Sequence, residues 1–202
     1  MIALILEEKM ESVKPHTSQT AYRRQRQIED CLYENMLHTP YASISVSDIC
    51  RQVGISRKAF YNYYHDKDAC LCAIIDRVLR DAVLHTTTHS PDSATPLEAA
   101  MVLLDYWKSQ KPFYDILVRN NLLYMLVFRN VDYVLKEDPG FLDLLSTPEV
   151  KSDADILACY TSSHITLVLQ WYFRGFDTPT EEMAKKLLRI MHVPMIPPAA
   201  EE

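Results

Sequence analysis

Residues 45–67 read S-V-S-D-I-C-R-Q-V-G-I-S-R-K-A-F-Y-N-Y-Y-H-D-K, and this stretch predicts two short helices joined by a tight turn. Gly54 ends the first helix, because a residue without a Cβ readily adopts the left-handed conformation that closes a helix. Ser56 begins the second, since its hydroxyl can accept hydrogen bonds from backbone N–H groups of the next turn. Two helices joined by such a turn form the helix-turn-helix arrangement, whose second helix lies in the DNA major groove. We therefore predict a DNA-binding protein.

Amphipathic segments flank this motif on both sides. Residues 20–37 place their apolar side chains on one stripe, and residues 66–85 keep apolar residues at i, i+3 and i+4 over three turns, with Asp66 as N-cap. Three arginines (Arg23, Arg24 and Arg26) stand at the start of the first segment. They are either a solvated helix end or a set of phosphate contacts beside the groove-reading unit.

The remaining chain also favours helices. Only 3 glycines occur in 202 residues, and we find no alternating strand pattern. Helices are expected at 95–109, 112–119, 122–135, 153–176 and 178–191, where Thr95 and Thr178 are predicted caps followed by proline. The threonine run 86–88 predicts a loop or frayed helix end after His85, because threonine is a poor helix former. We predict an all-α protein of about nine helices, with tails at 1–18 and 193–202.

Charge is distributed unevenly along the chain. The net charge is −6, which by itself argues against a nucleic-acid partner. Residues 18–67, however, contain seven basic and five acidic residues, a net charge of +2, so the remainder carries −8. A mildly basic head on an acidic body fits a DNA reader whose body does not touch the DNA.

Several other classes of protein are disfavoured. The five cysteines show no paired metal-binding spacing, and no catalytic Ser/His/Asp set or phosphate loop appears, so we predict no enzyme, cofactor or metal. Asp81, His85 and His89, at i, i+4 and i+8, would be metal ligands only if the helix continued through the threonines. No apolar run reaches membrane-spanning length, and no secretory signal is recognised, so a cytoplasmic protein without membrane contact is expected.

The head resembles the TetR family of transcriptional regulators. The matching positions are Ser45, Val46, Asp48, Ile49, Gly54, Ser56, Tyr61, Tyr63, Lys67 and Leu71. The resemblance implies a DNA-binding domain at 19–67 whose second helix reads bases with Arg57, Lys58 and Ala59. It also implies phosphate contacts from Ser45, Ser47, Tyr61, Tyr63 and Lys67, with Asn62 on the same outward face. Base readout is expected to rest on Arg57 and Lys58, since alanine offers only a methyl group.

The resemblance further implies that residues 68–192 bind a small-molecule effector and dimerise, with 68–89 as the connecting helix. Dimerisation is expected through the last two helices, with Leu167, Trp171, Met183, Leu187 and Met191 at the interface. Candidate effector-pocket residues, for which plain core packing is the alternative, are Tyr106, Phe113, Tyr124, Met125, Phe128, Tyr160 and His164. The expected function is a homodimeric regulator, a repressor, on a palindromic double-stranded DNA operator. The alternative is an adaptor of the same fold that acts through protein–protein contacts.

Overall fold

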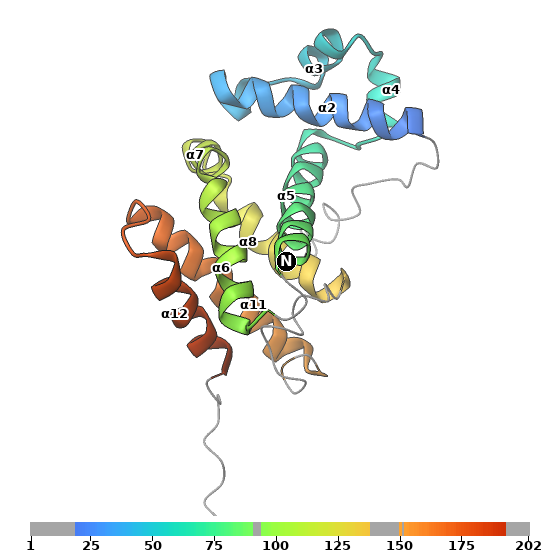
Figure 1. The fold of residues 1–202 in the computed structure, drawn as a ribbon. Helices are drawn as coiled ribbons and strands as arrows, with labels where there is room; N and C mark the ends of the chain where they lie inside the picture. The colour runs from blue at the N-terminus through green and yellow to red at the C-terminus, as the bar shows by residue number, and fades with distance from the viewer. Residues whose placement is uncertain (1–18, 91–93, 138–149, 151, 193–202) are drawn as a thin grey trace, which may run out of the picture. The chain divides into compact units, whose positions relative to one another are not determined.

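The computed structural model describes residues 19–90, 94–137, 150 and 152–192. Within these residues the chain forms nine α-helices, one 3₁₀ turn and no strand, which confirms the predicted all-α class (Figure 1). The elements are α2 (Gln19–His38), η1 (Tyr41–Ser43), α3 (Val46–Val53), α4 (Arg57–Tyr61), α5 (Lys67–His89), α6 (Pro96–Ser109), α7 (Lys111–Arg119), α8 (Leu123–Glu137), α11 (Ala154–Phe173) and α12 (Thr180–His192). None of the described helices is long and apolar enough to cross a membrane. The two predicted tails lie outside the described residues.

The chain divides into two compact units. Unit 1 comprises Met1–Val78 and Phe113–Leu126, and unit 2 comprises Leu79–Pro112 and Val127–Glu202. The division falls inside α5 rather than at the expected boundary between residues 67 and 68, and α7 contributes most of its length to unit 1.

Unit 1 is built on α2, which packs against α3, while α3 packs against α4 (Figure 1). The periodic apolar residues expected on α2 are buried: Ile28 and Leu32 are fully enclosed, and Met36 is 1% exposed. Ile49 from α3 and Phe60 from α4 are equally enclosed. A single apolar core therefore fixes both helices of the predicted motif.

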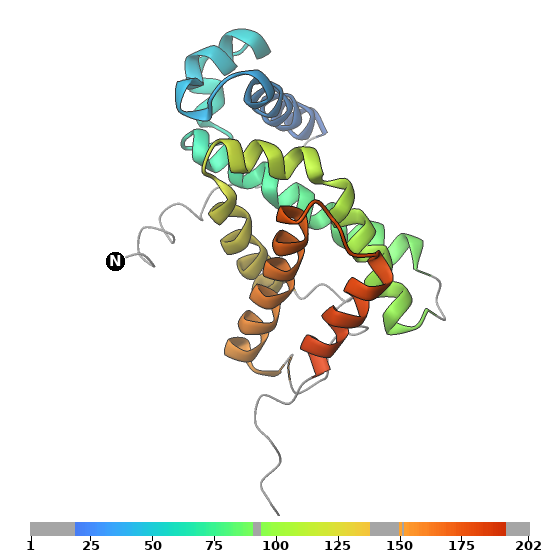
Figure 2. The ribbon, with the colours of Figure 1, turned by 90° about the vertical axis from the view of Figure 1, so that its left-hand side faces the viewer.

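Unit 2 is organised around α6, which packs against α12 and α11 (Figure 2). Thr95 begins α6 with a capping box: its side chain accepts from the Glu98 N–H, and the Glu98 carboxylate accepts from the Thr95 N–H at 2.7 Å. Trp107 and Trp171 are buried at 2% and 0% exposure. The two helices 95–109 and 112–119 expected from the sequence are confirmed to within a residue.

Some helix ends differ from expectation. α5 continues through the threonines to His89, because the hydroxyls of Thr86 and Thr87 donate to the carbonyls of Ala82 and Val83, at 2.8 and 3.0 Å. Their side chains therefore find hydrogen bonds inside the helix rather than competing with it.

α11 ends at Phe173, three residues earlier than predicted, and α12 begins at Thr180 rather than Thr178. The intervening turn places Gly175 at φ +71 and Phe176 at φ +57. The Thr178 carbonyl accepts a hydrogen bond from the Trp171 indole at 3.0 Å, so it anchors the turn to the core.

Candidate nucleic-acid interface

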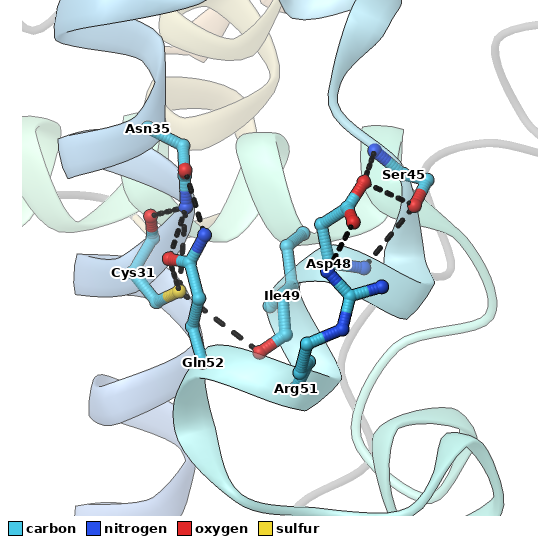
Figure 3. A network of polar contacts seen from close by, with 7 residues as sticks. All are labelled: Cys31, Asn35, Ser45, Asp48, Ile49, Arg51 and Gln52. Atoms are coloured by element: carbon cyan, nitrogen blue, oxygen red, sulfur yellow. Dashed lines mark hydrogen bonds and ion pairs between the residues drawn. The ribbon is translucent and has the colours of Figure 1, made fainter.

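α3 begins with a complete capping box at Ser45. The Ser45 hydroxyl accepts from the Asp48 N–H at 3.1 Å and donates to the Asp48 carboxylate at 2.5 Å (Figure 3). The same carboxylate pairs with Arg51 at 3.1 Å. The hydrogen bonds from Ser45 lower the pKa of Asp48. An eight-residue helix that is marginal alone thus gains a defined start.

The turn between α3 and α4 depends on Gly54, as predicted. Gly54 adopts φ +71 and ψ +40, and its N–H donates to the Cys50 carbonyl. The following N–H of Ile55 donates to the same carbonyl at 2.9 Å. Ser56 then caps α4 by accepting from the Ala59 N–H at 3.1 Å. The glycine cap and the serine cap set the angle between the two helices.

Two aromatic side chains hold α4 against the core. Phe60 is fully buried and Tyr64 is 1% exposed, so both face inward. The Tyr64 hydroxyl donates to the Glu29 carboxylate at 2.6 Å, and Arg77 donates to the same carboxylate at 2.8 Å. Burial raises the pKa of Glu29, although both partners oppose the rise. This buried network joins α2, the chain after α4, and α5, and sequence periodicity gives no sign of it.

The outward face of α4 carries Arg57, Lys58 and Tyr61, which are all exposed. The Arg57 guanidinium donates to the Tyr61 hydroxyl at 3.2 Å and lies 5.9 Å from the centre of its ring. This hydrogen bond raises the pKa of Arg57, so its charge is retained. Ala59 is half-buried between the two faces. α4 therefore presents two cations on a short helix whose inner side is locked.

The remaining predicted contact residues differ in their surroundings. Ser45 and Asn62 are exposed, and Ser47 and Tyr63 are half-buried. Asn62 also closes α4 through its backbone N–H.

Lys67 is the residue whose surroundings depart most from expectation. Its ammonium donates to the carbonyls of Tyr41 and Ile44 at 2.5 and 2.7 Å, and burial lowers its pKa. Two of its three N–H groups thus fix the chain around η1, and the ammonium lies 4.0 Å from the centre of the Tyr41 ring.

Further polar contacts that the sequence did not reveal brace the motif. The amide of Asn35 on α2 exchanges hydrogen bonds with the amide of Gln52 on α3, at 2.8 and 3.1 Å, and the Cys31 thiol joins them (Figure 3). The Arg119 guanidinium donates to the last carbonyls of α2, those of Met36 and Leu37. Among the three arginines near the start of α2, Arg24 donates to the Val53 carbonyl at 3.4 Å.

The predicted effector-pocket residues are divided between the units. Phe113, Tyr124 and Met125 belong to unit 1, whereas Tyr106, Phe128, Tyr160 and His164 belong to unit 2. Tyr124 and Phe128 are about half exposed, at 53% and 47%, while Phe113 and Tyr160 are buried. In unit 2, Tyr106 and His164 both approach Trp107, with ring centres 5.6 and 6.5 Å away.

The predicted dimer residues lie mainly inside the protomer. Trp171, Met183 and Leu187 are no more than 1% exposed, and Leu167 is half-buried, while the side chain of Met191 lies outside the described residues. The three buried side chains are already covered within their own chain. No three metal-ligating side chains converge within the described residues, Asp81, His85 and His89 included.

Comparisons with known proteins agree with the geometry of the head. The family model described as "Bacterial regulatory proteins, tetR family" matches residues 35–74, and the model "Transcriptional regulator C-terminal region" matches residues 94–193. The HTH-type transcriptional regulator EthR of Mycobacterium tuberculosis is 43% identical over 61 residues, which are 29% of this chain and 28% of that protein. The uncharacterized HTH-type transcriptional regulator YxbF of Bacillus subtilis is 26% identical over 193 residues, 92% of this chain and 48% of that protein. The chain thus spans under a third of one curated relative and about half of the other.

Solved structures show the same fold. A TetR transcriptional regulator from Streptococcus agalactiae matches with a TM-score of 0.58 and 17% identity, over 86% of this chain and 96% of that one. The fatty acid degradation regulator FadR from Bacillus halodurans matches with a TM-score of 0.51 and 16% identity, over 89% and 97%. At such identities the likeness concerns the fold alone.

Proposed function

The chain belongs to the TetR family of transcriptional regulators, and from this premise we propose that it is a homodimeric repressor of a palindromic DNA operator. In this proposal α4 enters the major groove, and a small-molecule effector bound by unit 2 weakens the complex. The effector must bind the DNA-free conformation more tightly than the DNA-bound one, since a ligand with equal affinity for both shifts nothing.

The observation that carries the proposal is the two-sided character of α4. Its inner side is fixed by Phe60, while Arg57 and Lys58 are exposed on its outer side. Arginine and lysine donate to guanine O6 and N7 in the major groove, and each well-made bidentate contact discriminates by about 1–3 kcal/mol. The Tyr61 hydroxyl holds the Arg57 side chain before DNA arrives, which reduces the side-chain entropy lost on binding.

A homodimer follows from the shortness of this reading surface. One α4 of five residues reaches few base pairs, so two copies on successive major grooves are needed for a specific site. Two-fold symmetry of the protein then requires an inverted repeat in the DNA. The mass of the protein in solution, measured by light scattering, should be twice that of one chain.

The test is selection from a pool of random double-stranded DNA, followed by affinity measurement on the enriched sequence. We expect an inverted repeat with half-site centres one helical turn apart, or a multiple of it. Arg57→Ala should cost about 1–3 kcal/mol in binding free energy and relax the preference at one base position of each half-site. Arg174→Ala is the control, because Arg174 is an exposed arginine of unit 2 paired with Asp177.

Failure to enrich any sequence would refute the operator proposal. If the same protein then formed a stable stoichiometric complex with a partner protein, the adaptor function would replace it. Enrichment of a site that Arg57→Ala and Tyr61→Ala bind as tightly as the unmodified protein would place the reading surface elsewhere than on α4.

A further inference from the structure

Unit 2 contains a continuous cluster of aromatic and imidazole rings from three helices, which we call the ring cluster: His85, His89, Tyr106, Trp107 and His164. On α5 the imidazoles of His85 and His89 stack with centres 4.2 Å apart. His85 meets Tyr106 of α6 at 5.4 Å. Trp107, next on α6, meets His164 of α11 at 6.5 Å, so the rings link all three helices.

Three polar atoms in this cluster are buried without a protein hydrogen-bond partner among the described residues. They are Nδ1 of His85, Nε1 of Trp107 and Nε2 of His164. Buried polar side-chain atoms nearly always have a partner, because leaving one unpaired costs its full desolvation. One local packing defect would leave one such atom, whereas here three occur in one cluster of contacting rings. A ligand with its own polar atoms beside these rings would supply the partners that the protein does not.

The chemistry of these atoms restricts the ligand. The indole N–H of Trp107 only donates, so it requires an acceptor such as a carbonyl or hydroxyl oxygen. Burial lowers the pKa of His164 to about 4, so its imidazole is neutral at physiological pH and offers one N–H and one lone pair. Neither side chain supplies a positive charge, and a carboxylate placed against them would exchange its hydration for neutral hydrogen bonds. The faces of Tyr106 and Trp107 favour a flat apolar body.

We propose that the ring cluster binds a small uncharged molecule with an aromatic or otherwise flat apolar body and one oxygen that accepts from the Trp107 indole, with His85 and His164 completing its hydrogen bonds. The inference rests on the proposed function in one respect: this molecule would be the effector. The binding itself is independent of DNA. The proposal gives His85 and His164 a role that needs no metal ion. Within the described residues no three ligating side chains come together.

The test uses four probes: acetophenone, 1-phenylethanol and ethylbenzene, which share one carbon skeleton, and benzoate, which is one carbon shorter and carries a negative charge. Binding to the full chain is followed by saturation-transfer NMR and by titration of tryptophan fluorescence. Fragments of this size bind weakly, so relative affinities decide the outcome. We expect acetophenone and 1-phenylethanol to bind about two- to tenfold more tightly than ethylbenzene, as one well-made hydrogen bond predicts, and benzoate to bind least.

Substitutions locate the site. Trp107→Phe and His164→Phe keep an aromatic ring but remove the polar atom. Trp107→Phe should abolish the preference for acetophenone over ethylbenzene, and His164→Phe should reduce it, because the indole donor remains. His65→Phe is the matched control, because His65 is an exposed histidine of unit 1 that pairs with Asp66. The comparison among probes on the unmodified protein needs no variant, so it holds even if a substituted chain fails to fold.

Equal binding of all four probes, or no binding by any, would overturn the inference and leave the ring cluster as core packing. A preference for acetophenone that survives both substitutions would also overturn it. The two proposals fail separately. If acetophenone binds but does not release the selected DNA, the ligand site stands and its effector role falls. If no DNA is selected but the probe preference is found, the regulatory function falls and the site stands.

Discussion

The buried carboxylate of Glu29 should make the stability of unit 1 depend on two partners in a measurable way. Glu29 is 4% exposed and Tyr64 is 1% exposed, and their hydrogen bond is 2.6 Å long. Tyr64→Phe keeps the ring and deletes only the hydroxyl. Hydrogen bonds to charged groups contribute about 1.5–3 kcal/mol, and both ends of this one are buried, so we expect a loss of about 2 kcal/mol in the free energy of unfolding at pH 7.

Removing the cationic partner should cost more. Arg77 donates to Glu29 at 2.8 Å and to Asp30 at 2.9 Å. Arg77→Met preserves the length of the side chain but leaves the Glu29 carboxylate buried without its counter-charge. Breaking a buried ion pair in this way costs about 3–5 kcal/mol. Glu29→Gln in the same chain should recover part of this loss, because the uncompensated charge is then absent.

The cost should also depend on pH, with a defined sign. The pKa of Glu29 is already raised in the folded protein, mainly by burial, so folding favours its neutral form. Stability from such a group is fully present below the unfolded pKa, near 4.5, and is lost as pH rises through the folded pKa. Arg77→Met removes an interaction that lowers this pKa, so the cost of the substitution should shrink as pH falls from 7 to 5.

Urea unfolding followed by far-ultraviolet circular dichroism measures these free energies, and amide hydrogen exchange localises the change to α2 and the chain around Tyr64. A loss below about 0.5 kcal/mol for Tyr64→Phe is the size expected of an ordinary surface change and would show that the hydroxyl contributes nothing net. A cost for Arg77→Met that neither varies with pH nor responds to Glu29→Gln would refute the assignment of Glu29 as a buried charge.

Two further predictions concern single positions. Gly54 and Gly175 both have φ +71, and a Cβ at either position meets nothing within 4 Å, so Gly54→Ala and Gly175→Ala should each lose about 1–2 kcal/mol of stability from backbone conformation alone. Only Gly54→Ala should weaken binding of the selected DNA. Equal weakening by both substitutions would show that the turn at Gly54 has no specific part in DNA binding. For His164, whose folded pKa of about 4 lies below its ordinary 6.5, stability is present above pH 6.5 and is lost as pH falls toward 4, by about 3 kcal/mol at most. In urea titrations at pH 7, 5.5 and 4.5, the free energy of unfolding should therefore decline less steeply with falling pH for His164→Gln than for the unmodified protein. Parallel declines would contradict the lowered pKa of His164.

Local sequence determined most of the head. A glycine between two short apolar patterns, with a serine cap before the second helix, predicts the turn at Gly54 and both helices, because backbone conformation and capping involve residues only a few positions apart. The same locality applies within the second helix, where Phe60 is buried and Arg57 and Lys58 are exposed. It also explains why the start of α6 at Thr95-Pro96 was found, since its capping box spans four residues.

The partners of polar groups were decided only by the tertiary structure. Lys67 lies 26 residues from Tyr41 in the sequence, Glu29 lies 48 from Arg77, and Arg119 lies 83 from Met36, so no local pattern reveals that they meet. The same holds for Trp107 and His164, whose rings meet only because α6 packs against α11. The spacing of apolar residues in the sequence predicts which face of a helix is apolar. Which helix covers that face depends on the packing of the whole chain. That is why the start of α4 at its Ser56 cap could be predicted, while the network that holds α4 and the ring cluster in unit 2 could not.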